Sequence, residues 1–557
     1  MLRTSVHIAI LTLQLSQLAA ATVPLNRSAA PTIKLDDGIF IGLNTGATNE
    51  FLGIPFAKPP VGDLRLRLPQ ANEPYHGIFN ATVFGNRCIS QDLTANIPSD
   101  TMNPTAVSVL SAVLQRFNSN EVESEDCLFV NVVVPANATG ESKLPVVFWI
   151  YGSGFESGTS SAYNGSAVVQ RSLELDTPVI YVSLNHRCVL SLGFPGGKEA
   201  KEAGIGNLGL RDQRLAMRWV QKYISTFGGD PAKVMIWGES AGASAVEMHM
   251  LANGGDNQGL FRSAFMHSVA VFPDDYSMDI GQAVFDQFVS DAGCADALGS
   301  VVVFDCLRAL PIDAIRNATT PTPGVFGYTS LSIGWRPYAD GVFVTTSPTQ
   351  LVLDGSITDI PYVIGNAEDE ATMFVLSATN ITTDEELQAY LSDNAFAAFS
   401  MTGIDRILGL YSSDPTAGSP FDTGDANAIT PEYKRMAAVL GDAFLQAPRR
   451  FLLRQRSGQQ PSYAYLYSRF KSTPYLGAFH TSDDADIYGP GDLTDAIVRF
   501  AATLDPNGVL NVTWPRYTPD APQMFRFLDG DVPFEVINDT FRENGIDALI
   551  ELEAEVA

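Results

Sequence analysis

Apolar residues gather in short runs along the chain, and several runs are nearly continuous in apolar character. Such runs, rich in β-branched and aromatic residues, are typical of strands covered on both faces of a sheet. They are LPVVFWIY from Leu144, TPVIYVSL from Thr177, KVMIW from Lys233, IPYVIG from Ile360 and SYAYLYS from Ser462. Between them lie helical patterns such as residues 208–227, where one side is supplied by Leu208, Leu210, Leu215, Met217, Trp219, Val220 and Ile224. This alternation predicts an α/β fold with a mostly parallel sheet, helices on both faces and sites at the carboxyl ends of strands.

The composition favours one large globular domain. The chain has 557 residues, of which 45% are hydrophobic and 17% are charged, so it can bury a large core. No Pro/Gly/Ser-rich linker, charge run or internal repeat divides it.

The first residues resemble a secretory signal. A lone Arg3 precedes an apolar stretch from Val6 to about Leu18, and small residues follow up to Ala21, where a peptidase would cut. A membrane helix is disfavoured because the stretch is short and interrupted by polar residues, and no later segment has 18 uninterrupted apolar residues. We expect a signal peptide over residues 1–21 and a secreted, extracellular protein over residues 22–557 without a transmembrane segment.

Glycosylation and charge refine this picture. Acceptor tripeptides begin at Asn26, Asn80, Asn137, Asn164, Asn317, Asn380, Asn511 and Asn538. In an exported chain, some of them should carry glycans on the surface. The formal charge of −27 disfavours nucleic acid and anionic membranes as partners.

Five cysteines are present, at positions 88, 127, 188, 294 and 306. There is no CxxC and no His/Cys cluster at metal spacing, so we expect no metal. Disulfides are the default in an exported protein, although sequence alone leaves the connectivity open. Nearest-neighbour pairing would join Cys88 to Cys127 and Cys294 to Cys306. Cys188 would then remain as a buried, inert thiol.

The candidate nucleophile is Ser240. The strand KVMIW runs directly into GESAG and then into the helical pattern ASAVEMHMLA. This order matches the Gly-x-Ser-x-Gly nucleophile elbow, in which a strained turn raises the serine hydroxyl above a helix N-terminus. Gly238 and Gly242 fit it because side chains there would press on neighbouring backbone. An ordinary strand-to-helix turn is the alternative.

A serine hydroxyl needs a base, and His480 is the best candidate. In hydrolases built on this turn, the acid and then the histidine follow the serine along the chain. His249 and His267 follow Ser240 too closely, whereas His480 lies in a loop beyond the strand SYAYLYS. A solvated loop histidine is the alternative.

The acid that orients the histidine should follow a strand between these two positions. IPYVIGNAEDEATMF offers Glu368, Asp369 and Glu370 directly after such a strand. The pattern does not identify which of the three is the acid. A solvated acidic loop without a catalytic role would have the same sequence pattern.

Backbone amides must bind the oxygen that becomes negative during acyl transfer. One would come from Ala241, directly after the nucleophile, and others from the Gly-rich segment YGSGF after the strand LPVVFWI. Gly-rich turns after strands are common, so this feature counts only together with the others.

These residues together resemble the type-B carboxylesterase and lipase family, whose members include cholinesterases, carboxylesterases and secreted fungal lipases. The resemblance covers nearly the whole mature chain. It rests on FLGIPFAKPPVGDLRLRLPQ at 51–70, SEDCLFVNV at 124–132, residues 206–243 from GNLGLRDQ to GESAGA, RPYADGVF at 336–343, GNAEDEATMF at 365–374, LGAFHTSDD at 476–484, and the DPNG and WPRY segments near the C-terminus.

The resemblance implies an α/β-hydrolase fold and assigns roles. It implies a catalytic triad of Ser240, Glu370 and His480, which chooses the third carboxyl of the acidic loop. It also implies disulfides Cys88–Cys127 and Cys294–Cys306, and an oxyanion hole formed by the amides of Ser153, Gly154 and Ala241. No cofactor is needed.

Three departures from the family pattern bear on activity. Ser153 stands where the family has the middle glycine of a Gly-Gly-Gly run, so its Cβ would strain the loop if the backbone has a positive φ. Ala371 replaces the usual glycine after the acid, and MHSVA at 266–270 replaces an MQSG-like segment. We expect these changes to tune activity without abolishing it.

A lid is expected over residues 88–127. Within it, NPTAVSVLSAVLQRF predicts a short helix with Asn103 as N-cap and Pro104 at the first helical position. Its wide apolar face contains Val107, Leu110, Val113, Leu114 and Phe117. A helix packed into the core is the commoner fate of such a face, but a disulfide-bounded excursion resembles the lid of fungal lipases.

The sequence therefore predicts hydrolysis of lipophilic esters, such as acylglycerols, sterol esters or long-chain esters, through an acyl-enzyme. The partners would be a small-molecule or lipid ester and, through the lid, a lipid–water interface. The alternatives are a non-lipolytic carboxylesterase acting on small soluble esters and a catalytically silent binding module.

Overall fold

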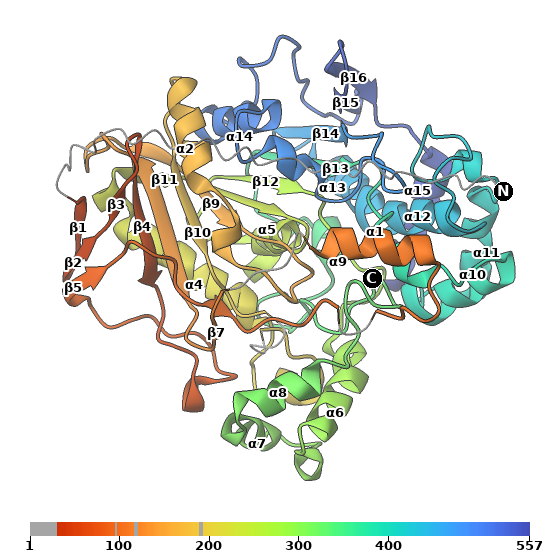
Figure 1. Ribbon diagram of the computed structural model, residues 1–557, viewed down its shortest axis with the longest axis horizontal. Coiled ribbons are helices and arrows are strands. Elements are labelled where there is room, and N and C mark those ends of the chain that lie inside the picture. Colours follow the sequence, from red (N-terminus) through yellow and green to blue (C-terminus); the bar gives the residue numbers. More distant parts are fainter. Residues whose placement is uncertain (1–29, 95–96, 116–120, 189–192) are drawn as a thin grey trace, which may run out of the picture.

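The molecule is built on an 11-stranded mixed sheet. The computed structural model describes residues 30–557 apart from 95–96, 116–120 and 189–192 (Figure 1). In spatial order the strands are β16 (Phe534–Asn538), β15 (Gln523–Leu528), β14 (Ser462–Ser468), β13 (Tyr362–Ala367), β12 (Ser263–His267), β11 (Gly229–Glu239), β9 (Leu144–Ile150), β10 (Ile180–Leu184), β8 (Phe129–Pro135), β4 (Thr48–Pro55) and β3 (Leu43–Asn44). The strands from β15 to β10 are parallel to their neighbours, and the pairs at both edges are antiparallel. The predicted mostly parallel sheet is confirmed.

Among the described residues, two smaller sheets lie outside it. One has the order β1 (Thr32–Leu35), β2 (Asp37–Ile41) and β5 (His76–Asn80), and the other pairs β6 (Arg87–Cys88) with β7 (Glu123–Ser124).

The continuous apolar runs arise because the central strands are buried on both faces. Along β9, Val146, Phe148 and Ile150 belong to one hydrophobic cluster, whereas Val147 and Trp149 belong to another. Because successive side chains of a strand point to opposite faces, each face needs its own apolar set.

Helices supply the two coverings. On one face, α2 (Gly165–Glu174) packs on β8 and β10 and α14 (Asp492–Thr503) packs on β9 and β11. On the other face lie α4 (Leu208–Tyr223), α5 (Ala241–Leu251) and α13 (Ala447–Arg456). The apolar side predicted for residues 208–227 is buried apart from the half-buried Leu215. α4 also buries Asp212, which the pattern does not predict and which pairs with Arg187 at 2.7 Å.

A group of helices projects from the sheet at the bottom of Figure 1. It comprises α6 (Gln282–Asp291), α7 (Val303–Ala309) and α8 (Ile312–Thr319). The disulfide Cys294–Cys306 lies within it, with a Cα–Cα distance of 6.0 Å. The other helices are α3 (Lys198–Glu202), α9 (Pro348–Leu353), α10 (Asp384–Tyr390), α11 (Met401–Leu410), α12 (Tyr433–Gly441) and α15 (Glu543–Val556).

Within its described residues, the expected lid segment contains one helix, α1 (Pro104–Leu114), and a disulfide between Cys88 and Cys127 closes the segment. Asn103 is its N-cap, accepting a hydrogen bond from the Thr105 amide at 2.9 Å, and Pro104 is the first helical residue. Leu110, Val113 and Leu114 are buried, as are Ala106 and Met102. The helix therefore packs its apolar face inward in this conformation. Phe117, expected on the same face, lies outside the described residues.

Cys188 is a free, buried thiol. Burial raises the pKa of this thiol to about 12, so it is not a ready thiolate nucleophile. Among the helices of the described residues, none has the length and apolar character needed to cross a bilayer.

Candidate active site

The candidate site residues stand at the carboxyl ends of neighbouring parallel strands. Ser240 follows β11, the Gly-rich segment follows β9, and the acidic loop follows β13. His480 lies in the long loop after β14. Because these ends meet at one edge of the sheet, residues far apart in sequence converge there.

The turn at Ser240 is strained as the motif requires. Ser240 has φ 56° and ψ −127°, a conformation that a non-glycine residue seldom adopts. A Cβ on Gly238 would lie 2.4 Å from the Gly242 carbonyl, and one on Gly242 would lie 2.1 Å from the Ile150 oxygen. Both glycines are therefore needed for the close approach of backbone to backbone.

His480 bridges the serine and the third carboxyl of the acidic loop. Its Nε2 lies 2.8 Å from the Ser240 Oγ, and its Nδ1 lies 2.6 Å from Glu370 Oε2. Both His480 and Glu370 are 2% exposed. With Nδ1–H donating to the carboxylate, Nε2 is left to accept the serine proton.

The other oxygen of Glu370 is fully occupied. Its Oε1 accepts hydrogen bonds from the Ser268 hydroxyl at 2.6 Å, the Ala367 amide at 2.8 Å and the Asn366 side chain at 3.2 Å. These donors fix the carboxylate so that only Oε2 faces His480. Ser268 stands in the MHSVA segment, and its role was not foreseen from the sequence.

The other two acidic candidates have different partners. Glu368 pairs with Arg526 at 2.9 Å, and Asp369 pairs with Lys471 at 2.6 Å. Neither of them contacts His480 by a hydrogen bond or ion pair that the described residues show.

The segment expected to bind an oxyanion lies beside the serine. A Cβ on Gly152 would lie 2.8 Å from the Ser240 Cβ and 2.6 Å from the Glu239 oxygen. Ser153 has φ 69° and Gly154 has φ 64°. Ser153 therefore adopts the left-handed conformation in which its Cβ is strained. Ala241 is the first residue of α5, where backbone amides have no partner within the helix.

Glu156, which sequence reasoning did not single out, braces this segment. Its amide donates to the Ser153 oxygen at 3.0 Å, its carbonyl accepts from Gln91, and its Oε2 accepts from the Val325 amide at 3.1 Å. Burial raises the pKa of its carboxyl to about 8. Burial thus favours the neutral form of this side chain beside the Gly-rich segment.

A second histidine–carboxylate pair lies behind the site. His267 Nε2 accepts from the Trp237 indole at 2.7 Å, and its Nδ1 lies 3.0 Å from Asp483 Oδ2. Tyr465 donates to the same oxygen at 3.0 Å. Burial favours the neutral form of Asp483, but the hydrogen bond from His267 holds the pKa of this carboxyl below its usual value. This buried pair ties β12 to the loop that carries His480.

Glu239, the residue between Gly238 and Ser240, also faces the imidazole, with its Oε1 3.4 Å from His480 Nε2. Its position inside the GxSxG motif is the only sequence signal for this contact. In the part of the chain that the structure describes, no cluster of three or more His, Cys, Asp or Glu could hold a metal ion.

The fold and this arrangement define the class: the molecule has the α/β-hydrolase fold. The solved structure of EstA from Aspergillus niger matches with a TM-score of 0.78 and 26% identity, covering 95% of this chain and 99% of that one. Lipase 4 of Diutina rugosa is 39% identical over 94% of this chain and 96% of its own length. Secreted lipase 1 of Botryotinia fuckeliana is 38% identical over 96% of this chain and 95% of its own length.

The sequence model of the carboxylesterase family matches residues 29–533, and the chain belongs to that family. Its chemical class, carboxylic ester hydrolase, follows from this membership and from the lipases that it matches.

Proposed function

We propose that the protein is a secreted serine esterase that cleaves lipophilic esters with Ser240 as nucleophile, His480 as base and Glu370 as the orienting acid. The observation that carries this proposal is the continuous chain of hydrogen bonds, 2.8 Å from Ser240 Oγ to His480 Nε2 and 2.6 Å from His480 Nδ1 to Glu370 Oε2. These distances lie within the reach that proton transfer requires.

The proposed reaction has two halves. Ser240 Oγ attacks the ester carbonyl carbon while His480 Nε2 takes the hydroxyl proton, and Glu370 stabilises the imidazolium. The tetrahedral intermediate collapses, the bond to the alcohol oxygen breaks, and Nε2 protonates the departing alcohol. Water then attacks the acyl-enzyme by the same route and releases the carboxylic acid.

The oxyanion would be bound by the amides of Ser153, Gly154 and Ala241. The support is positional. Gly152 brings the first two amides against Ser240, the left-handed backbone at Ser153 and Gly154 turns the segment sharply, and Ala241 opens α5 directly after the nucleophile.

Lipophilic esters are favoured as substrates by the apolar surroundings of the imidazole. The Phe374 ring lies 5.0 Å from the His480 ring, and Phe326 stacks on Phe374 at 5.9 Å. Several relatives are named lipases, including the secreted triacylglycerol lipase LIP1 of Gibberella zeae, 35% identical over 94% of this chain. A non-lipolytic carboxylesterase with the same mechanism is the second candidate, and membership of the carboxylesterase family is compatible with it.

The segment from Cys88 to Cys127 is proposed as a lid that acts at a lipid–water interface. The disulfide anchors both ends, and the Asn103 amide donates to Thr379 Oγ1 at 3.0 Å. Thr379 directly follows the helical turn Val375–Ala378, nine residues after Glu370 in the chain, so α1 rests on a segment connected to the acid loop. Release of α1 would uncover its apolar face next to the site.

Secretion and glycosylation are supported by two further observations. The structure holds disulfides Cys88–Cys127 and Cys294–Cys306, which persist in oxidising compartments. All seven acceptor asparagines within the described residues are exposed, namely Asn80, Asn137, Asn164, Asn317, Asn380, Asn511 and Asn538. The proposed signal peptide, residues 1–21, and the acceptor Asn26 lie outside the described residues.

The decisive experiment compares the secreted wild-type protein with Ser240→Ala. The wild type should hydrolyse p-nitrophenyl esters and be labelled at Ser240 by a fluorophosphonate. The variant should lose both properties, with kcat reduced by about 10⁴-fold or more, and keep its thermal midpoint. Residual activity close to that of the wild type would reject Ser240 as the nucleophile. A folded wild type that is neither active nor labelled would favour a binding module instead.

A further inference from the structure

A buried carboxylate lies next to the proposed acid in the chain and contacts the loop that carries the proposed base. Asp369 directly precedes Glu370 and is 0% exposed. Its backbone amide donates to the Ala478 oxygen at 2.9 Å, and its Oδ2 accepts the Ala478 amide at 2.9 Å. Asp369 therefore binds both the carbonyl and the amide of Ala478, which lies two positions before His480. The loop that carries Ala478 and His480 is called the histidine loop.

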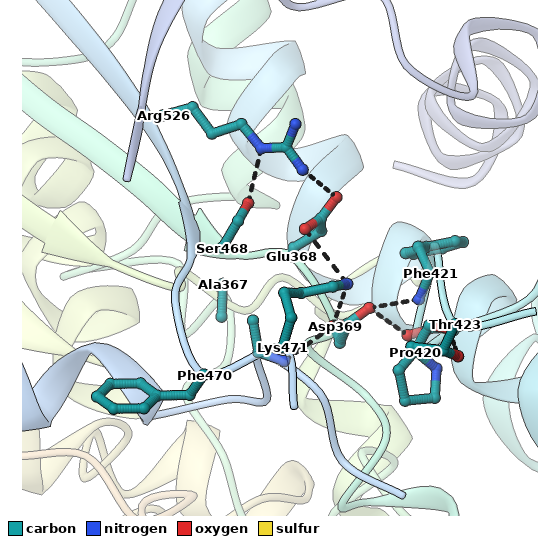
Figure 2. A network of polar contacts seen from close by, with 12 residues as sticks. Ala367, Glu368, Asp369, Pro420, Phe421, Thr423, Ser468, Phe470, Lys471 and Arg526 are labelled. Carbon is teal, nitrogen blue, oxygen red and sulfur yellow. Dashed lines mark hydrogen bonds and ion pairs between the residues drawn. The ribbon is translucent and has the colours of Figure 1, made fainter. Parts of the chain in front are cut away.

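The same carboxylate holds a third loop. Its Oδ1 accepts hydrogen bonds from the Phe421 amide at 2.8 Å and the Ser419 hydroxyl at 3.1 Å. Figure 2 shows Asp369 between this loop and the Lys471 ammonium. Three chain segments thus meet on one side chain.

Lys471 supplies the positive charge that this buried carboxylate needs. Its Nζ lies 2.6 Å from Asp369 Oδ2 and 3.3 Å from Glu368 Oε2. Arg526 completes the cluster in Figure 2, pairing with Glu368 and donating to the Ser468 hydroxyl at 2.8 Å. Because a buried charge without a counter-charge is strongly unfavourable, loss of Lys471 would release the grip of Asp369 on its neighbours.

The backbone around the cluster shows how tightly the two loops are fitted. Gly477 has φ 62°, and a Cβ there would lie 2.3 Å from Asp369 Oδ2. Only glycine allows the histidine loop to approach the carboxylate this closely. Gly477, Lys471 and Asp369 thus together fix the spacing between the loop of Glu370 and the histidine loop.

We propose that Asp369, held by Lys471, is a positioning residue that sets the register between the loop of Glu370 and the loop of His480. This inference rests on the proposed triad. Its consequence is catalytic, because a displacement of about 1 Å between reacting groups costs up to about 10²-fold in rate.

The test uses the full secreted chain and a soluble p-nitrophenyl ester. Lys471→Met and Asp369→Asn should each lower kcat per fluorophosphonate-titrated site by about tenfold or more, with KM within about twofold. The rate constant of fluorophosphonate labelling should fall in parallel. Lys471→Arg, which restores the charge, should recover kcat to within about threefold.

Glu368→Gln is the matched control, because it removes the other carboxylate of Lys471 without touching Ala478. It should keep kcat near that of the wild type. A merely structural role would lower the thermal midpoint or the fraction of titratable protein and leave kcat per titrated site unchanged, which would overturn the inference.

Two features keep the outcome clear. Lys471 is 22% exposed in its side chain, so its variants decide the matter if Asp369→Asn does not fold. Failure of the triad is distinguishable, since an active Ser240→Ala protein would reject the proposed function. An inactive Ser240→Ala beside fully active Lys471→Met and Asp369→Asn would reject only the positioning role.

Discussion

Two residues of the proposed active site have strained backbone conformations. Ser240 and Ser153 both have positive φ, at 56° and 69°. For an L-residue, such sparsely populated backbone conformations cost on the order of 1–3 kcal/mol each, which the surrounding strands and loops must offset. At Ser240 the strain raises the hydroxyl out of the sheet. At Ser153 the turn is retained although the residue is not glycine.

Neighbouring positions of the Gly-rich segment should therefore respond in opposite ways. Gly152→Ala should reduce kcat by about 10²-fold or more, because its Cβ would meet the Ser240 Cβ at 2.8 Å and the Glu239 oxygen at 2.6 Å. Ser153→Gly should keep kcat within a few fold, since glycine adopts positive φ without strain. Ester hydrolysis by the two purified variants measures this difference.

Ser153→Val is the control for the second half of that prediction. A β-branched side chain at φ 69° should distort the segment and lower kcat well below that of Ser153→Gly. Equal activity of the valine and glycine variants would show that the conformation of this residue does not matter for turnover.

At the residue scale, the sequence proposes a role where a motif names a residue and proposes none where a role depends on contacts. Ser240 follows from GxSxG, and His480 follows from chain order. The choice of Glu370 needed the family resemblance, because the sequence pattern cannot distinguish three adjacent carboxyls. Only their partners in the folded chain distinguish them. Ser268, Asp369 and Glu156 carry no motif of their own, since their roles arise from segments that meet only in the folded chain.

At the scale of elements, strands covered on both faces were the easiest to predict. The runs at β9, β10, β11, β13 and β14 matched strands because their apolar character is continuous. β12, with the sequence SAFMH, was missed. It is short and ends in a buried histidine that reads as polar until Trp237 and Asp483 are seen around it. The N-cap and Pro signals placed the start of α1 correctly.

The lid proposal makes a prediction about α1. Leu114→Asp places a charge on the buried apolar face and should impair hydrolysis of emulsified triacylglycerol more than hydrolysis of soluble esters. We expect a ratio of at least about fivefold between the two losses. Rates on both substrates for one preparation measure it.

Ser111→Asp is the matched control, because Ser111 lies on the exposed side of the same helix. It should leave the ratio of the two activities near that of the wild type. Equal losses on emulsified and soluble substrates in Leu114→Asp would identify α1 as an ordinary core helix.

At the scale of the whole molecule, titratable groups are unevenly distributed. The formal charge of −27 sits mostly on the surface, yet Glu156, Glu247 and Glu553 are buried. Burial raises the pKa of the first two carboxyls to about 8 and that of Glu553 to about 7. Burial lowers the pKa of His186 to about 4, and that of His249 falls well below its usual value.

These shifts predict how stability depends on pH. A carboxyl that is neutral in the folded state but ionised in the unfolded state stabilises the fold fully below the unfolded pKa, near 4.5, and loses that effect as pH rises through the folded pKa. His186 and His249, whose pKa values are lowered, act in the opposite direction, but mainly below about pH 6.5. From pH 6.5 to 8 the loss of stability therefore comes mainly from these buried carboxyls. The free energy of unfolding should fall by on the order of a few kcal/mol, and the thermal midpoint of the wild type should fall by a few degrees.

Glu247→Gln should make the thermal midpoint depend less on pH, whereas the exposed Glu385→Gln should not. Thermal melts at fixed scan rate across this range measure the slopes, and a wild-type midpoint that rises with pH would contradict the assignment of neutral buried carboxyls.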